Sequence, residues 1–265
     1  MVSELFGKAN RLSRIFNRSG KTIMLALDHG MALGPMQGLE RPAEMLDKLT
    51  SFTDSIMLNK GILRNCYTPN GHVGIVLRVS GAATIAGEDL TNESITTTVI
   101  EALRLSADAV ATSIYVGTPN EHSTIRDLAQ LCDECETYGL PVLAVTAIGK
   151  DRERKTDPRY LSLAVRVAVE MGADIVKTYY CDEKFEKVVE AAAGIPIVIA
   201  GGPKMDSVLD VLKIAENATR AGARGVDMGR NVWQHERPVE MLLALKDIVN
   251  DGVSAEEAYS KHFGR

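Results

Sequence analysis

The chain lacks a marked excess of charge of either sign. Its 265 residues include 30 lysines and arginines against 35 aspartates and glutamates, which gives a formal net charge of −5. No segment is rich in lysine or arginine. Because nucleic acids and anionic membranes are bound mainly through such basic segments, we expect neither as a partner and expect a small-molecule ligand instead.

Long hydrophobic runs are missing as well. No apolar segment approaches the roughly 20 residues that span a bilayer. Residues 1–20 carry charges throughout and place Leu5, Leu12, Ile15 and Phe16 at helical spacing, unlike the apolar centre of a signal peptide. We therefore expect an N-terminal amphipathic helix packed on the domain, and a cytoplasmic protein.

Cysteine is scarce and scattered. The four cysteines are Cys66, Cys132, Cys135 and Cys181, and they suit a reduced protein rather than a disulfide framework. Cys132 and Cys135 form a CxxC, but their segment has helical spacing and no second CxxC or nearby histidine completes a zinc set. The five histidines contain no HxxxH pair. We expect a chance cysteine pair on the surface of a helix, and no metal site.

Short apolar runs alternate with longer amphipathic stretches. The runs, which suit buried parallel strands, are residues 23–28, 55–59, 74–79, 109–116, 142–147, 174–179, 197–200 and 225–229. The stretches, which suit helices, are residues 42–52, 92–105, 123–138, 160–171, 182–193, 206–221 and 238–249. Such alternation predicts right-handed βαβ units. Eight strands in a chain that is 45% hydrophobic favour a single (β/α)8 barrel over residues 1–265, rather than an open doubly wound sheet.

One crossover departs from this pattern. Residues 80–90 are rich in glycine and alanine and only weakly periodic, so we expect a loop there before the helix at residues 92–105. The other strand ends matter more, because side chains at the carboxyl ends of barrel strands face the active site.

Lys177 stands inside one of the apolar runs, next to Ile175 and Val176. Partial burial there disfavours the ammonium form and favours a free amine that attacks a carbonyl to form an imine. Asp28, at the end of the first run, can assist the proton transfers. Its neighbour His29 is either a general base or a side chain that binds its own loop. The alternative for Lys177 is an ion pair at the barrel rim.

Glycines end the last two runs, at Gly201, Gly202 and Gly229. Barrels often bind phosphate after strands seven and eight, because glycine lets backbone N–H groups approach oxygen atoms. Arg230 and Lys204 can add charge. A Gly-Gly pair alone is often a simple turn, but two such strand ends favour phosphate binding. No P-loop or GxGxxG is present, so a nucleotide is not indicated.

Four motifs occur in the order LDHG, DIVKTYY, VIAGGPK and GVDMGRNVWQ. Together they resemble the archaeal-type class I aldolase family, the DeoC/LacD-like aldolases with a DHG signature, over nearly the whole chain. The resemblance implies a TIM barrel, a Schiff-base lysine at Lys177, an acidic partner at Asp28 and a phosphate site at the glycine loops and Arg230. It also implies a homo-oligomer, often a decamer, and a phosphorylated ketose as substrate.

Within that family the resemblance implies one of three activities. They are fructose-bisphosphate aldolase, aminodideoxyheptulosonate synthase, and the thiolase that moves an acetyl group from 3-hydroxy-5-phosphonooxypentane-2,4-dione to coenzyme A. The first two usually carry a tyrosine acid after the fifth strand, where this chain has Ala147 in AVTAIGKD. We therefore favour the thiolase branch, with no bound cofactor and coenzyme A as co-substrate.

Other side chains near that position are weaker candidates. Thr146 is the nearest polar one, but a hydroxyl of this kind is too weakly acidic to be a general acid at neutral pH. Tyr179 falls on the same side of its strand as Lys177 and Tyr180 on the other. Lys150 is either a coenzyme A contact or a solvated charge. An alternative of another class is a sugar-phosphate-binding protein that has lost turnover with its tyrosine.

Overall fold

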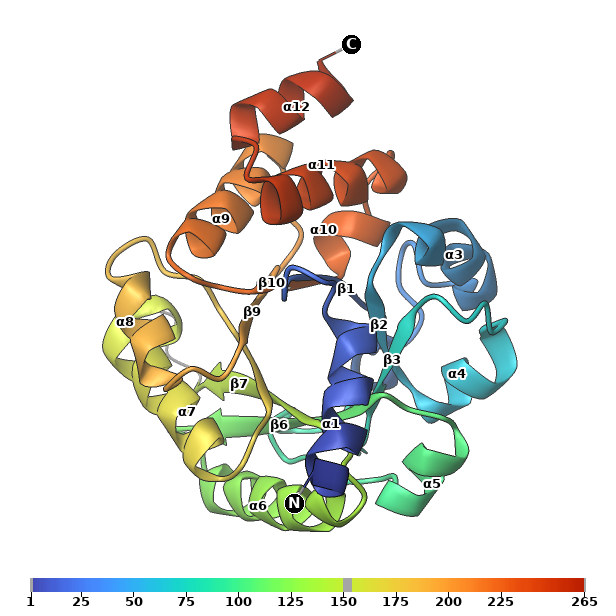
Figure 1. The fold of residues 1–265 in the computed structure, drawn as a ribbon, viewed down its shortest axis with the longest axis vertical. Coiled ribbons are helices and arrows are strands. Elements are labelled where there is room, and N and C mark those ends of the chain that lie inside the picture. The colour runs from blue at the N-terminus through green and yellow to red at the C-terminus, as the bar shows by residue number, and fades with distance from the viewer. Residues whose placement is uncertain (1, 150–153, 265) are drawn as a thin grey trace.

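In a computed structural model, which describes residues 2–149 and 154–264, eight parallel strands close into a barrel (Figure 1). Their order around the barrel is β1-β10-β9-β8-β7-β6-β3-β2. The barrel strands are β1 Thr22–Ala26, β2 Ser55–Asn59, β3 Gly74–Arg78, β6 Ala109–Val116, β7 Val142–Ile148, β8 Ile175–Thr178, β9 Ile197–Ala200 and β10 Gly225–Met228. The predicted barrel is confirmed, and closure between β1 and β10 rules out the open sheet.

Helices surround the barrel, as Figure 1 shows. They are α1 Val2–Ile15, α2 Gly30–Leu33, α3 Pro42–Leu49, α4 Lys60–Cys66, α5 Val99–Arg104, α6 Glu121–Thr137, α7 Pro158–Glu170, α8 Phe185–Ala191, α9 Val208–Arg220, α10 Arg230–Trp233, α11 Pro238–Asp251 and α12 Ala255–Phe263, with 3-10 turns η1 Thr50–Phe52 and η2 Arg154–Thr156. In the described part of the chain, no helix has the length and apolar character to cross a membrane.

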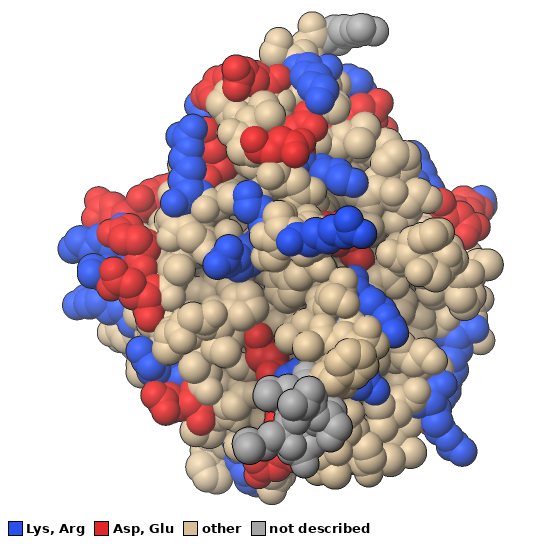
Figure 2. Space-filling model, viewed as in Figure 1, with Lys and Arg blue, Asp and Glu red and all other residues tan. Residues whose placement is uncertain are grey.

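The expected N-terminal helix is α1, and it closes the amino-terminal end of the barrel. Ile15 is fully buried among the inward-facing side chains Met24, Met57 and Val76. A Cβ on Gly74, where β3 begins, would lie 2.4 Å from the carbonyl oxygen of Arg14. Figure 1 shows α1 crossing this end, and acidic and basic side chains are interspersed on the same face in Figure 2. The barrel therefore opens toward solvent at its other end.

Charged groups hold α1 in this position. Nη1 of Arg14 lies 2.8 Å from Oδ1 of Asp108, which directly precedes β6, and Nζ of Lys8 lies 2.9 Å from Oδ1 of Asp174, which precedes β8. The second oxygen of each aspartate accepts a backbone N–H, from Ile75 and Val142 respectively. The same carboxylates thus join neighbouring strands to each other and to the helix.

The region after β3 differs from the expectation. Ser80–Gly81 (β4) and Ser94–Ile95 (β5) form a small antiparallel pair, so the segment expected to be only a loop contains a strand. The helix expected from residue 92 begins at Val99, because Thr98 caps it by accepting the N–H of Glu101. Pairing of β5 with β4 withdraws residues 94 and 95 from the helix.

The cysteine pair is helical but not on the surface. Cys132 and Cys135 lie in α6, 7% and 0% exposed, facing the core. Burial raises the pKa of each thiol to about 12. The expected surface position was wrong because these residues lie on the side of α6 that packs against the barrel. The described residues contain no group of three or more His, Cys, Asp or Glu side chains arranged to hold a metal.

Candidate active site

A cavity of about 410 Å³ lies at the carboxyl ends of the barrel strands. Its walls come from strand ends and the loops that follow them, which is where barrel enzymes carry their catalytic groups. The polar and charged side chains lining it are Asp28, His29, Arg78, Glu93, Ser113, Tyr115, Thr146, Lys155, Lys177, Tyr179, Asp227 and Arg230. Residues far apart in the sequence therefore share one space.

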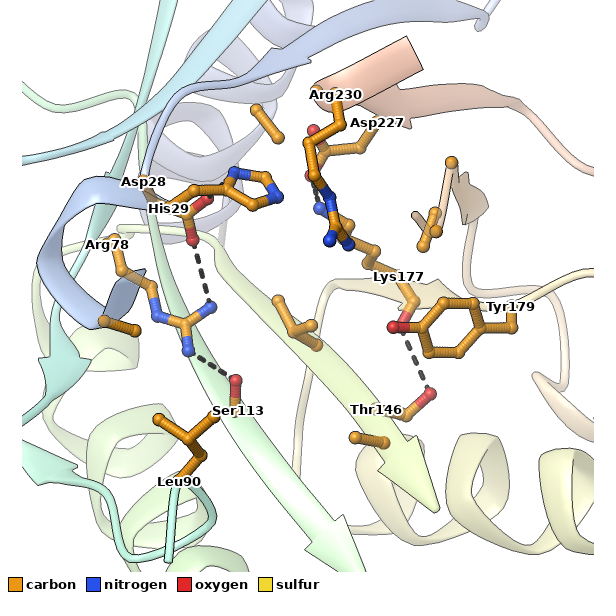
Figure 3. A pocket seen from close by; sticks show the side chains of 18 of the residues that line it. Asp28, His29, Arg78, Leu90, Ser113, Thr146, Lys177, Tyr179, Asp227 and Arg230 are labelled. Carbon is orange, nitrogen blue, oxygen red and sulfur yellow. Dashed lines mark hydrogen bonds and ion pairs between the residues drawn. The ribbon is translucent and has the colours of Figure 1, made fainter. Parts of the chain in front are cut away.

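Lys177 lies on β8 and reaches into this cavity (Figure 3). Its Nζ is 2.8 Å from Oδ2 of Asp227 on β10, and the two side chains are 9% and 0% exposed. Both oxygens of Asp227 are buried without a hydrogen-bond partner within the described chain, so its contact with Lys177 is an ion pair and not a well-aligned hydrogen bond. Sequence reasoning missed Asp227, although a carboxylate inside the apolar strand GVDM was the same kind of signal as Lys177 inside IVKT.

Asp28 follows β1 and faces the cavity from the opposite side in Figure 3. Its Oδ2 lies 3.4 Å from Nη1 of Arg78 on β3, and its Oδ1 lies 3.5 Å from Nδ1 of His29. Burial raises the pKa of Asp28, but the positive charge of Arg78, with a smaller contribution from Lys177, outweighs burial and holds that pKa below its ordinary value. Asp28 is therefore an ionised carboxylate rather than a proton donor at neutral pH.

Arg78 links Asp28 to a second carboxylate. Its Nη2 lies 2.8 Å from Oε2 of Glu93 and also contacts the Ser113 hydroxyl. The Tyr115 hydroxyl donates to Oε1 of Glu93 at 2.6 Å. Burial, with the negative charge of Glu93, raises the pKa of Tyr115 and keeps the phenol neutral. This buried network was also missed, although an arginine at the end of the apolar strand GIVLR signalled it.

His29 is a neutral imidazole. Burial lowers its pKa to about 4, and Lys177 and Arg230 add to this against the attraction of Asp28. The ring packs edge-on against Trp233 with centroids 5.5 Å apart. The ring lines the cavity. Its Nδ1 has no hydrogen-bond partner in the described structure, so this atom does not bind the loop that carries His29.

The two glycine loops predicted to bind phosphate lie together at the cavity wall. Asn231 ties them, because its Nδ2 donates to the Gly201 oxygen at 2.6 Å and its Oδ1 accepts the Met205 N–H at 2.8 Å. A Cβ on Gly229 would lie 2.8 Å from the Ala26 oxygen and 2.8 Å from Cε1 of His29. Gly202 has a φ of +67°, a value that favours glycine.

Arg230 adds an unpaired donor to this wall. Its Nε is buried without a hydrogen-bond partner in the described chain, and the side chain lines the cavity beside Gly202 and Gly229. A buried guanidinium donor of this kind suits an anionic ligand. The structure thus brings together the four predicted phosphate residues, Gly201, Gly202, Gly229 and Arg230.

The remaining candidates divide. Thr146 and Ala147 line the cavity, but the Thr146 hydroxyl donates to the backbone oxygen of Lys177 at 3.2 Å. Tyr179 also lines it, on the side of the strand predicted for it. Lys204 is exposed and absent from the described lining. Lys150 lies outside the described residues.

Tyr180 lies away from the cavity, whereas Lys155 lines it. Tyr180 packs against Phe185, with ring centroids 5.2 Å apart, on the outer side of the barrel. Lys155 lines the cavity from η2 and was not anticipated. An exposed lysine in a polar loop carries no signal that distinguishes it from an ordinary surface charge.

The mouth of this closed parallel barrel holds a buried lysine paired with one aspartate, a second aspartate paired with an arginine, and two glycine loops beside Arg230. These features are typical of barrel enzymes that work through a lysine amine. The chain belongs to the DeoC/LacD aldolase family, whose model matches residues 22–235. It is thus an enzyme of the class I aldolase type.

Two relatives and one solved structure illustrate the family. Over 255 residues, covering 96% of this chain and 86% of each relative, it is 47% identical to an uncharacterised aldolase of Pasteurella multocida and 45% identical to a 3-hydroxy-5-phosphonooxypentane-2,4-dione thiolase of Yersinia enterocolitica. An archaeal fructose-1,6-bisphosphate aldolase, solved with its catalytic lysine bound to the carbinolamine intermediate, is 31% identical with a TM-score of 0.83, covering 91% of this chain and 99% of that one.

Proposed function

We propose that the protein transfers an acetyl group from 3-hydroxy-5-phosphonooxypentane-2,4-dione to coenzyme A, through an imine on Lys177. The observation that carries this proposal is the buried amine of Lys177 facing the cavity, while Ala147 stands at the end of the neighbouring strand β7. The site thus supports imine chemistry without the tyrosine that the aldolase branches use at this place. The similarity to the Yersinia thiolase supports the same substrate.

The substrate's carbon skeleton suits a lysine imine. Its two carbonyls lie at carbons 2 and 4, its hydroxyl at carbon 3 and its phosphate on carbon 5. An imine at carbon 4, once protonated, accepts the electron pair released when the bond between carbons 2 and 3 breaks. The thiol takes the acetyl group, and after carbon 3 gains a proton and the imine hydrolyses, the remainder is dihydroxyacetone phosphate.

The phosphate of the substrate would lie at the wall formed by Gly202, Gly229 and Arg230. Arg230 offers a buried Nε–H without a hydrogen-bond partner in the described chain, and a side chain at Gly229 would run into the Ala26 oxygen and the His29 ring. Holding the phosphate there fixes carbon 4 against the amine, so that binding energy is used for positioning. Asp28 and Arg78 face the same space and would contact the polar middle of the substrate.

Borohydride reduction tests the imine. The protein is incubated with dihydroxyacetone phosphate, reduced, digested and mapped, with the Lys177→Met variant as control. We expect a covalent adduct on Lys177 in the wild type and none in the variant. An adduct on another lysine, or none at all, would refute the proposal.

The second candidate function is an aldolase, because the chain is 31% identical to the archaeal fructose-1,6-bisphosphate aldolase. Dependence on coenzyme A distinguishes the thiolase from the aldolase. We expect acetyl-coenzyme A to form from the five-carbon substrate only when coenzyme A is present, and fructose 1,6-bisphosphate to be cleaved poorly. Rapid cleavage of fructose 1,6-bisphosphate without coenzyme A would assign the aldolase reaction instead.

We also propose that the chain assembles into a homo-oligomer, for which a decamer is the expectation from the family resemblance. Phe6, Ile85 and Leu163 are 69%, 63% and 49% exposed, but they lie on different elements. Single exposed apolar side chains are ordinary on a protein surface, so the family resemblance alone carries this proposal. Light scattering on the purified protein gives the mass directly, and a monomer at micromolar concentration would contradict the proposal.

A further inference from the structure

The ion pair between Lys177 and Asp227 lies where a proton must move during imine formation. Nζ of Lys177 and Oδ2 of Asp227 are 2.8 Å apart as an ion pair, close enough for direct proton transfer once an N–H of the ammonium rotates toward the oxygen. Oδ1 of Asp227 is buried and unpartnered in the described structure, and Asp227 lines the cavity. We infer that Asp227 is a catalytic residue that takes a proton from Lys177 and returns it to the departing hydroxyl. This inference rests on the proposed imine at Lys177.

The neighbouring polar groups are less suited to this role. Asp28 is held ionised by Arg78. Glu93 is engaged by Arg78, by the Ser80 hydroxyl at 2.7 Å and by the Tyr115 hydroxyl at 2.6 Å.

Thr146 and Ala147, on the neighbouring strand β7, are also unsuited to carry the proton. The Thr146 hydroxyl donates to the backbone of β8, and Ala147 has no acidic group. Among the described side chains that line the cavity, Asp227 is the carboxylate recorded within 4.0 Å of the lysine nitrogen.

The surroundings shift the pKa values of Asp227 and Asp28 in opposite directions, as expected if Asp227 exchanges a proton and Asp28 does not. Burial raises the pKa of Asp227, and Asp28 raises it further, against the attraction of Lys177. The pKa of Asp28 is lowered. Two carboxylates whose pKa values are pushed apart take different roles, one exchanging protons and the other remaining a fixed charge.

Every proton is accounted for during formation of the iminium. The ammonium of Lys177 gives a proton to the Asp227 carboxylate, which leaves a neutral amine. The amine attacks the ketone carbon, and one nitrogen proton moves to the oxygen, giving a carbinolamine. The Asp227 carboxyl then protonates that hydroxyl, the C–O bond breaks, and water leaves. The products are an iminium on Lys177, an Asp227 carboxylate as its counter-charge, and one water.

If the ion pair is purely structural, Asp227→Asn should change the rate of imine formation in the opposite direction. If Asp227 only holds the ammonium in place, Asp227→Asn removes an attraction that favours the charged form, so more free amine is present and the imine forms faster. If Asp227 carries the proton, the same change stops the hydroxyl from leaving and the imine forms more slowly. The sign of the rate change therefore separates the two roles.

Single-turnover trapping measures that rate. Dihydroxyacetone phosphate is mixed with the protein, borohydride is added after set times, and the adduct on Lys177 is quantified. Borohydride reduces the iminium and not the carbinolamine. We expect Asp227→Asn to slow adduct formation about 100-fold or more, the usual contribution of general acid–base catalysis. Calorimetry should show that the variant still binds the ligand, which separates a lost step from lost binding.

The matched control is Asp108→Asn, which changes another buried aspartate that pairs with a basic side chain, at the opposite end of the barrel. It should leave the trapping rate unchanged. If wild-type protein gives no adduct, the proposed imine fails together with this inference. If wild type is trapped and Asp227→Asn is equally fast or faster, the role of Asp227 alone is refuted.

Chemical rescue provides a second test that does not depend on Asn. Asp227→Ala leaves room for a small acid, and added formate should restore adduct formation in proportion to its concentration. Formate should have no effect on wild type or on Lys177→Met. Asp227→Glu, which keeps a carboxyl, should form the adduct faster than Asp227→Asn. Absence of both rescues in folded protein, checked by circular dichroism, would overturn the assignment.

Discussion

Nη1 of Arg78 lies 3.4 Å from Oδ2 of Asp28 and joins the third barrel strand to the loop after the first. The same guanidinium holds Glu93 with Nη2 at 2.8 Å. Arg78 is 6% exposed, so one buried cation balances two carboxylates. This arrangement fixes one wall of the cavity and leaves Lys177 and Asp227 as a separate pair on the other side (Figure 3).

Arg78→Met should destabilise the protein strongly. The substitution keeps a long apolar side chain but leaves two buried carboxylates without their cation, a loss of about 3–5 kcal/mol in the free energy of unfolding. Urea denaturation measures it. Arg159→Met is the control, because Arg159 pairs with Asp157 at the surface, and it should change stability little. Equal stability of the two variants would contradict the balance described for Arg78.

His29 should make stability depend on pH. The folded protein lowers its pKa from 6.5 to about 4, so folding favours the neutral ring. Between these values the unfolded chain binds the proton more readily, and stability falls as pH falls from about 6.5 to about 4. The full effect is about 3 kcal/mol. Urea unfolding at several pH values in this range gives the free energy of unfolding as a function of pH. This dependence on pH should be weaker for His29→Phe than for wild type, and an unchanged dependence would contradict the assignment.

Gly229→Ala should damage the proposed phosphate site. The added Cβ would lie 2.8 Å from both the Ala26 oxygen and the His29 ring, so β10 and the His29 loop must separate. We expect the affinity for inorganic phosphate, measured by calorimetry, to fall at least about tenfold, a cost of about 1.4 kcal/mol. Gly61→Ala is the control, since nothing lies within 4 Å of its added Cβ in α4, and its phosphate affinity should match wild type.

Ala147→Tyr should move the enzyme toward aldol cleavage. Ala147 lines the cavity beside Tyr115 on the neighbouring strand, so a phenol there can reach the reacting carbon chain. We expect cleavage of fructose 1,6-bisphosphate to rise about tenfold or more. Ala147→Phe supplies the same ring without the acid and should give no gain. If both variants behave alike, the alignment of Ala147 with the family tyrosine is wrong.

Ile15→Ala tests the role of α1. Ile15 is fully buried where α1 meets the inward-facing barrel side chains, so the substitution opens a cavity and should cost about 2–5 kcal/mol of unfolding free energy. Phe6→Ala, at a position 69% exposed on the same helix, should cost much less. Guanidinium denaturation compares them. An equal loss in both variants would mean that α1 does not close the barrel in this way.

Much of the site was predictable from local patterns. Lys177 stands out because a lysine inside an apolar strand needs a reason, and Gly201, Gly202, Gly229 and Arg230 follow strands whose ends meet in a barrel. Asp227 and Arg78 carried similar local signals, but nothing in the sequence says that Asp227 meets Lys177 or that Arg78 meets Asp28. Those partners lie 50 residues apart in each case.

The sequence by itself determined the alternation of strands and helices, the barrel it favours and the lysine at its centre, because side-chain periodicity and turn chemistry are local properties. The tertiary structure decided which charges pair. Lys177 on β8 and Asp227 on β10 are separated by β9, and they meet because side chains from alternate strands share a layer inside a closed barrel. That closure fixes the strand stagger, which no local pattern in the chain encodes.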